Sequence, residues 1–213
     1  MPAPQPATPG GPSADLDVRE QLIRGALALI TDEGPVDLSV RRLAKAADRT
    51  TMCVYTKFTN RQGLLEAVYQ RAGEELLAHL EPHVRDGALA TADAYVARAR
   101  LDAGRYALLL GQPLAALGIP DAARVRLVAD LGALLVRALE ADGLPTPAAS
   151  AAAPSLWAAV HGLVALGDAQ PDGGTPTPRE HLARLAGVAG VAGGAGVAGV
   201  AGVAAHGPSS AGR

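Results

Sequence analysis

The sequence predicts an all-α protein in which an N-terminal module of three to four helices is followed by a larger helical bundle. Hydrophobic residues make up 49% of the 213 residues, which is enough to build a buried core. Aromatic residues, which favour strands, are scarce, because the chain has one Phe, one Trp and four Tyr. Alanine and leucine, both good helix formers, dominate the middle of the chain.

The chain begins with a segment that is expected to be disordered. Residues 1–14 are rich in Pro, Gly, Ser and Thr and lack bulky apolar side chains, so burial cannot offset the entropy cost of ordering them. From Leu16 to Ile30, apolar residues recur at helical spacing, and Gly34 and Pro35 end the pattern. A first helix is therefore expected between these points.

Two short helices joined by a tight turn are expected next. Ser39 is placed to cap the first of them, and Thr50 is placed to cap the second, which ends at Phe58. The turn is centred on Asp48 and Arg49. The inner face of the first short helix is apolar and consists of Val40, Leu43, Ala44 and Ala47.

A longer helix completes this module. Asn60 is placed to cap it, and it is expected to end near Pro82. Its apolar stripe consists of Leu64, Leu65, Val68, Ala72, Leu76 and Leu80. We therefore assign residues 15–80 to a single module.

The remainder of the chain predicts a second bundle and a tail. Helices are expected over 89–111, with a break at Gly104, over 121–142 and 148–168, and from Pro178 to at least Leu185. Residues 81–186 then form the second module. Residues 187–213 form a low-complexity Gly-Ala-Val tail, whose glycines disfavour helix and strand alike. The tail matches the pattern G-x-G-x-x-G at 194–199, but no strand precedes it, so a dinucleotide site is not predicted.

The charge of the chain is unevenly distributed. Between Ser39 and Gln62 there are six basic residues and one acid, a local charge of +5 within a chain whose net charge is −2. The single cysteine excludes an internal disulfide, and the N-terminus has no charged segment followed by an apolar one. A cytoplasmic location is therefore expected.

The basic segment has the organisation of a helix-turn-helix between Ser39 and Phe58. Two short helices joined by a tight turn allow the second to lie in the major groove of DNA. The side chains of Thr51, Met52 and Cys53, at its start, are short enough for the backbone to approach base edges. The outward hydroxyl of Tyr55 and ammonium of Lys57 suit phosphate oxygens. Arg41 and Arg61 are expected to reach the DNA backbone on either flank.

The same residues resemble a known family. The run Val54-Tyr55-Thr56-Lys57-Phe58, followed by Asn60-Arg61 and Leu64-Leu65, is similar to the N-terminal domain of TetR-type repressors. The resemblance covers residues 16 to about 80 and implies base or phosphate contacts from this helix, with a phosphate clamp at Arg61. The candidate DNA-binding residues are Arg41, Thr50, Thr51, Met52, Cys53, Tyr55, Lys57 and Arg61.

The turn departs from the family pattern, which has Gly followed by an apolar residue. Here the two positions hold Asp48 and Arg49. Aspartate tolerates the left-handed conformation less well than glycine, so some strain is expected. Arg49 stands where the family pattern has a small apolar side chain. Its own side chain is expected to point outward, where it would add a phosphate contact.

The second module contains a motif with two interpretations. Trp157 and His161 are four residues apart and share a helix face, and the W…H-G pattern resembles a C-terminal domain found in some TetR-type proteins. The pair either packs in the core or lines an effector pocket together with Tyr95 and Tyr106. The resemblance implies a ligand cavity and a dimer interface formed by the last two long helices, 148–168 and 178 onward.

Two further features could suggest a metal site or a redox role, but neither role is favoured. His79 and His83 are four residues apart, but Pro82 lies between them and no third ligand is near, so a solvated surface is favoured over a metal site. Cys53 has no resolving cysteine, and a small residue in contact with the groove explains it without redox chemistry. We predict no metal and no cofactor.

The favoured function is therefore a repressor that binds a palindromic double-stranded operator as a homodimer and is released by a small hydrophobic effector, with no membrane involvement. The two recognition helices of such a dimer lie about 34 Å apart. The alternative is a constitutive DNA-binding or protein-interaction protein without a ligand response. An enzyme is not favoured, because the sequence has no G-x-S-x-G, Walker loop or H-E-x-x-H motif.

Overall fold

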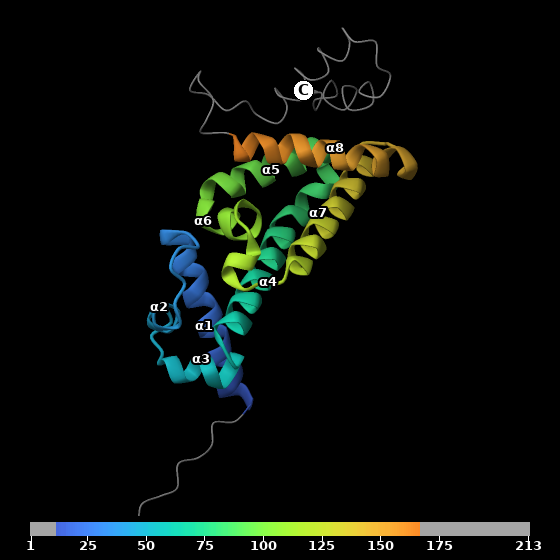
Figure 1. Cartoon of the computed structure of the whole chain (residues 1–213). Coiled ribbons are helices and arrows are strands. Elements are labelled where there is room, and N and C mark those ends of the chain that lie inside the picture. The colour runs from blue at the N-terminus through green and yellow to red at the C-terminus, as the bar shows by residue number, and fades with distance from the viewer. Residues whose placement is uncertain (1–11, 167–213) are drawn as a thin grey trace, which may run out of the picture. The chain divides into compact units, whose positions relative to one another are not determined.

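The computed structural model describes residues 12–166, which are helical with connecting turns and contain no strand (Figure 1). The all-α prediction is confirmed for this part of the chain. Its elements are α1 (Pro12–Glu33), α2 (Val40–Ala46), α3 (Thr51–Phe58), α4 (Arg61–Leu80), the 3-10 helix η1 (Glu81–Asp86), α5 (Ala88–Leu101), α6 (Ala103–Tyr106), the π-helical turn η2 (Ala107–Gly111), the 3-10 helix η3 (Leu114–Leu117), α7 (Asp121–Ala141) and α8 (Thr146–Ala165).

The described residues fall into two units. The first comprises the N-terminal helices up to Ala72 together with 104–121, and the second comprises 73–103 and the chain from Ala122 onward. This division differs from the sequence-based boundary after residue 80. The segment 104–121 packs with the N-terminal helices because a close approach anchors it there: a Cβ added to Gly104 would lie 1.9 Å from the carbonyl oxygen of Ile30.

The core of the first unit is built on the predicted stripe of α1. Leu22, Ala26 and Ile30 are fully buried, and they pack in a core that includes Leu43 of α2 and Val54 of α3. Helix α1 begins at Pro12, so residues 12–14, which were expected to belong to the disordered arm, have helical backbone. Proline is compatible with the first turn of a helix, because its missing N–H has no helical partner there. Residues 1–11 lie outside the described residues.

The local caps explain where the short helices begin. The Ser39 hydroxyl accepts the backbone N–H of Arg42 at 3.4 Å, and the Asn60 side chain accepts that of Gly63 at 2.8 Å, so both predicted caps are confirmed. Thr50 occupies the N-cap position of α3 but makes no side-chain capping bond. Its hydroxyl instead lies 3.5 Å from Sγ of Cys53.

The second unit is formed by the end of α4 together with η1, α5, α7 and α8. The helix predicted over 89–111 is interrupted at Asp102, two residues before the expected break at Gly104. The carboxylate of Asp142 accepts the first backbone N–H of α5, from Ala88, at 2.8 Å, and so anchors the start of that helix.

Helix α8 is mostly apolar and contains no Asp, Glu, Lys or Arg. By length and composition alone it could cross a membrane, although only 28% of that window is buried among the described residues. Its buried side chains are Ala149, Ala153, Leu156, Val160 and Leu163. A helix that packs a row of apolar side chains in a protein core can have the same length and composition. The helix expected from Pro178 and the Gly-Ala-Val tail lie outside the described residues.

Candidate nucleic-acid interface

Helix α3 presents one accessible face and is anchored by the opposite face. Val54 is fully buried and Phe58 is 8% exposed, whereas Met52 is 69% exposed and Tyr55 is 52% exposed. The guanidinium of Arg19 covers the Phe58 ring at 5.0 Å from its centroid, which closes the edge of this small core. The helix is therefore held by two apolar side chains while its outer face remains available.

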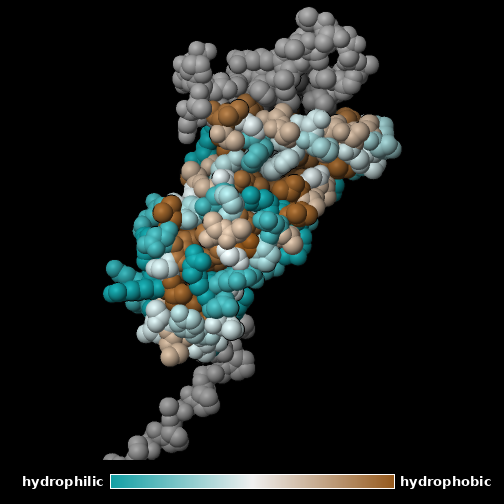
Figure 2. Space-filling view, viewed as in Figure 1, coloured by the Kyte–Doolittle hydropathy of each residue, from teal (hydrophilic) through white to brown (hydrophobic). Residues whose placement is uncertain are grey.

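A shallow, open hollow lies beside this helix. It has a volume of about 550 Å³ and is lined by residues of α2, the turn and the start of α3: Arg41, Ala44, Lys45, Asp48, Arg49, Thr50, Thr51 and Cys53. Four of the predicted DNA-binding residues are thus brought together on one concave surface. Hydrophilic side chains gather over α2 in Figure 2. Arg41 and Lys45 are both exposed and make this surface basic.

The turn between α2 and α3 has the conformation that its residue types suggested. Asp48 adopts a left-handed backbone with φ of 52°, and its N–H bonds to the Lys45 carbonyl at 3.0 Å. Arg49 is exposed, and its guanidinium contacts α1. Its Nε donates to the Gln21 side chain of α1 at 2.9 Å. A polar contact therefore stands where the family pattern has a small apolar side chain.

The close packing of α1 against α2 fixes the position of this turn. Gly25 of α1 faces the backbone of Ala47 so closely that an added Cβ would lie 2.6 Å from its Cα. On the neighbouring helix, the bidentate pair between Glu20 and Arg71 joins α1 to α4 at 2.6 and 2.8 Å. The Arg71 guanidinium lowers the pKa of the Glu20 carboxyl. Two helices thus support the helix-turn-helix from behind.

The other basic residues of the segment are placed differently. Arg42 pairs with Glu33 and Asp37, and the hydrogen bond that its guanidinium donates to the Glu33 carboxylate is the largest cause of its raised pKa. Lys57 is half-buried on α3. Arg61 is separate from the hollow: its Nε donates to the Leu38 carbonyl at 2.5 Å and its Nη1 to the Leu117 carbonyl at 3.2 Å. The expected phosphate clamp is therefore bound to two backbone carbonyls.

In the second unit, three predicted ligand-binding residues form one cluster. The Tyr95 hydroxyl lies 3.2 Å from Nδ1 of His161, and the indole of Trp157 stacks on the His161 ring with centroids 5.4 Å apart. Tyr95 and Trp157 meet edge to face at 5.2 Å. Burial is the largest cause of the lowered pKa of His161, followed by the charge of Arg124. Tyr106 belongs to the first unit.

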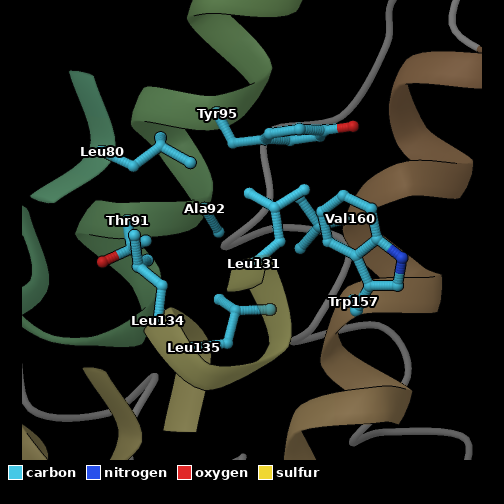
Figure 3. Close-up of a pocket in the computed structure, with 9 residues that line it drawn as sticks. All are labelled: Leu80, Thr91, Ala92, Tyr95, Leu131, Leu134, Leu135, Trp157 and Val160. Atoms are coloured by element: carbon cyan, nitrogen blue, oxygen red, sulfur yellow. The ribbon is translucent and has the colours of Figure 1, made fainter. Parts of the chain in front are cut away.

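Tyr95 and Trp157 line a small apolar cavity, shown in Figure 3. Its volume is about 10 Å³, room for one water molecule. Side chains from α4, α5, α7 and α8 converge on it, and its lining consists of Leu80, Thr91, Ala92, Tyr95, Leu131, Leu134, Leu135, Trp157 and Val160. Trp157 is half-buried, and its indole forms one wall of this cavity.

The histidine pair at the end of α4 lies at the surface. The ring centroids of His79 and His83 are 5.9 Å apart. Among residues 12–166, no group of three or more His, Cys, Asp or Glu side chains is placed to hold a metal ion.

Sequence reasoning missed the roles of Gln21 and Leu117. Neither residue belongs to a chemical motif, and each becomes informative only through its tertiary contacts.

Two family models match the chain over the regions that carry these features. Residues 22–68 match the model of bacterial regulatory proteins of the tetR family, and residues 88–189 match the tetracyclin repressor-like C-terminal domain. A curated relative is an uncharacterised HTH-type transcriptional regulator of Mycobacterium tuberculosis, 29% identical over 153 residues, which are 70% of this chain and 69% of that protein.

Solved structures share the fold. A tetR-family transcriptional regulator from Streptomyces coelicolor superimposes with a TM-score of 0.66 at 24% identity, covering 91% of this chain and 90% of that one. A putative transcriptional regulator from Pseudomonas aeruginosa PAO1 gives a TM-score of 0.57 at 24% identity, covering 84% and 91%. With both of its domain models matched and this fold, the chain belongs to the TetR family of DNA-binding transcriptional regulators.

Proposed function

We propose that this regulator is a cytoplasmic, homodimeric repressor that binds a palindromic operator through α3 and leaves it when a small hydrophobic effector binds the second unit. The single observation that carries the DNA-reading part is the outward face of α3. Met52 and Tyr55 are accessible side chains on a short helix whose other face is fixed in the core. Accessible side chains on a rigidly held helix can contact the bases and backbone of a major groove.

We assign two kinds of DNA contact to the residues of this surface. Thr51, Met52 and Cys53 face the bases, because they lie at the start of the helix that enters the groove. Arg41, Thr50, Tyr55 and Lys57 contact phosphates, which set the register of the protein on the duplex. Arg61 is omitted from this set, because Leu38 and Leu117 already bind its guanidinium.

A second copy of the chain is the partner that best suits α8. The helix buries one row of apolar side chains, while its exposed positions are dominated by small residues such as Ala148, Ala151, Ser155 and Ala158. Small side chains allow two helices to approach closely, and burial of further apolar surface favours association. A dimer formed this way would present two copies of α3 to one palindrome.

The effector site that we propose is the apolar cavity beside Trp157. At about 10 Å³ the cavity admits no effector until a wall moves. Trp157 is half-buried, so it is the wall residue best able to rotate outward, and that rotation would break its ring contacts to Tyr95 and His161. An effector that binds only the open form shifts the population toward that form.

The DNA part of this proposal is tested by selecting binding sites from random duplex DNA and then measuring stoichiometry by sedimentation. The proposal expects a palindromic consensus bound by two protomers. A single non-palindromic half-site bound by one protomer would argue against the homodimer. The variant Met52→Ala is expected to broaden the consensus, because one good base contact contributes about 1–3 kcal/mol of discrimination.

The effector part is tested with the single tryptophan of the chain as the reporter. Small apolar molecules, beginning with toluene, are added to the protein–DNA complex, and glycerol serves as the polar control. The proposal expects a molecule that shifts Trp157 emission and weakens DNA binding together. A shift in emission without any loss of DNA binding would favour the alternative, a constitutive DNA-binding protein.

A further inference from the structure

Arg61 joins two segments that are far apart in the sequence. It is the first residue of α4, and its guanidinium binds the carbonyl oxygens of Leu38 at 2.5 Å and Leu117 at 3.2 Å. Leu38 directly precedes Ser39, the N-cap of α2, and Leu117 is the last residue of η3. Both leucines are buried, at 2% and 5% exposed. One side chain therefore links the start of the helix-turn-helix to η3.

The geometry of this link requires arginine. Buried carbonyl groups need hydrogen-bond partners, and here two of them lie within reach of a single side chain. The guanidinium is a planar fork that donates to two acceptors at once, whereas the lysine ammonium is a flexible point charge. A phosphate group can pair with either cation. The substitution Arg61→Lys is therefore expected to preserve a phosphate contact but to lose the link between the two carbonyls.

The segment that contains Leu117 has further anchors on the N-terminal helices. The Tyr69 hydroxyl of α4 donates to the Leu109 carbonyl at 3.2 Å, and Arg105 donates to the Thr31 hydroxyl of α1 at 3.1 Å. The same segment, 104–121, is continuous with α5 at one end and with α7 at the other. Both helices supply walls of the apolar cavity, so the segment connects those walls covalently to the N-terminal helices.

We propose that Arg61 is a positioning residue that couples the DNA-binding helices to segment 104–121, and that it is not a phosphate ligand. Movement of η3 would pull on Leu38 through the guanidinium and so shift the start of α2. Because coupling is reciprocal, DNA bound at α3 must also change the stability of η3. This inference rests on DNA binding through α3, but it requires no effector.

The first test is the salt dependence of DNA binding by the full chain, using its selected duplex. Each phosphate contact contributes about 0.9 to the slope of log affinity against log salt. Arg61→Lys and Arg61→Gln are expected to keep the wild-type slope, while the control Lys57→Gln loses about one contact. A slope that falls in Arg61→Gln but is retained in Arg61→Lys would identify a phosphate ligand and overturn the proposal.

The second test is amide hydrogen exchange in the peptide 107–120, with and without the same duplex. The reporters are the N–H groups of Gly118 and Ile119, which close the end of η3 at 3.0 and 3.1 Å. DNA is expected to change exchange of this peptide in the wild type by roughly fivefold or more, the lower end of usual coupling between sites. Arg61→Lys and Arg61→Gln should lose that change, while Lys57→Gln keeps it at saturating DNA.

The outcomes remain distinguishable from failure of the DNA-binding proposal. If the wild type does not bind the duplex through α3, the affinity measurement shows it before any exchange experiment. If the wild type binds but exchange in 107–120 does not respond, Arg61 does not couple the two regions, whatever the variants do. If Arg61→Gln does not fold, as judged by circular dichroism, Arg61→Lys decides, and a retained exchange response in that variant overturns the proposal.

Discussion

The hydroxyl of Tyr95 lies 3.2 Å from Nδ1 of His161, so a residue of α5 is joined to a residue of α8 beside the apolar cavity. Trp157 stacks on the same imidazole. Because burial and Arg124 lower the pKa of His161, the folded protein favours the neutral ring. The hydrogen bond and the stacking thus belong to a histidine that resists protonation, which makes the stability of this unit dependent on pH.

Stability is expected to fall as the pH is lowered from 7.5 to 5.5. In the unfolded chain His161 titrates near its ordinary value of about 6.5, while in the folded protein it titrates lower. Between the two values the unfolded chain binds more protons, so acidification favours unfolding. His161→Asn, which retains a hydrogen-bonding group near Nδ1, should show a smaller decrease. Urea unfolding followed by Trp157 fluorescence at pH 7.5, 6.5 and 5.5 measures this, and parallel pH profiles would refute it.

Asp48→Gly is expected to stabilise the protein and strengthen DNA binding. The left-handed conformation of Asp48, with φ of 52°, costs a non-glycine residue about 1 kcal/mol, and glycine avoids that cost. The substitution also removes the only acid from the hollow. Asp48→Asn, which removes the charge while tolerating the same backbone, should strengthen binding without the full gain in stability. Thermal unfolding and DNA titration separate the two effects.

Gly25→Ala is expected to destabilise the first unit. Its new Cβ would lie 2.6 Å from the Ala47 Cα, and backbone cannot give way as a flexible side chain can. The matched control is Gly132→Ala in α7, where a Cβ meets nothing within 4 Å. That control should gain about 0.5–1 kcal/mol, the usual effect of replacing glycine in a helix. Equal unfolding midpoints for the two variants would show that α1 and α2 do not pack this closely.

Arg49→Ala should weaken DNA binding less than Lys45→Ala does. Arg49 is bound to Gln21 of α1, and breaking that bond to reach a phosphate offsets part of the gain. Lys45 is exposed on the same hollow, and its side chain has no hydrogen bond or ion pair to break among residues 12–166. Gln21→Ala should then release Arg49 and strengthen binding slightly at low salt. Fluorescence anisotropy with labelled duplex measures all three, and weaker binding by Gln21→Ala would contradict this account.

Local sequence signals predicted the elements that local physics determines. Ser39 and Asn60 cap their helices as expected, since a cap depends on residues two or three positions away. Asp48 adopts the left-handed turn because aspartate is among the few residue types that accept it. The accessible outer face and the apolar inner face of α3 followed from helical spacing alone.

Contacts between distant residues could not be predicted in this way. The bond from Arg61 to Leu117 spans 56 positions, and the one from Arg49 to Gln21 spans 28. Charge and family pattern both favoured phosphate contacts for these arginines, because the sequence gives no sign of which carbonyl or amide lies near. Tyr106 was grouped with Tyr95 by residue type, but tertiary packing places it in the other unit.

The central claim is that α3 reads DNA, and it is tested most directly by binding of the purified protein to the DNA flanking its own gene at several salt concentrations. Tyr55→Ala and Lys57→Ala are measured in parallel. The account predicts specific binding by the parent that falls steeply with salt, is weakened by both substitutions, and loses about one phosphate contact from the salt slope in Lys57→Ala. Equal binding by the parent and both variants to a selected high-affinity duplex would contradict it.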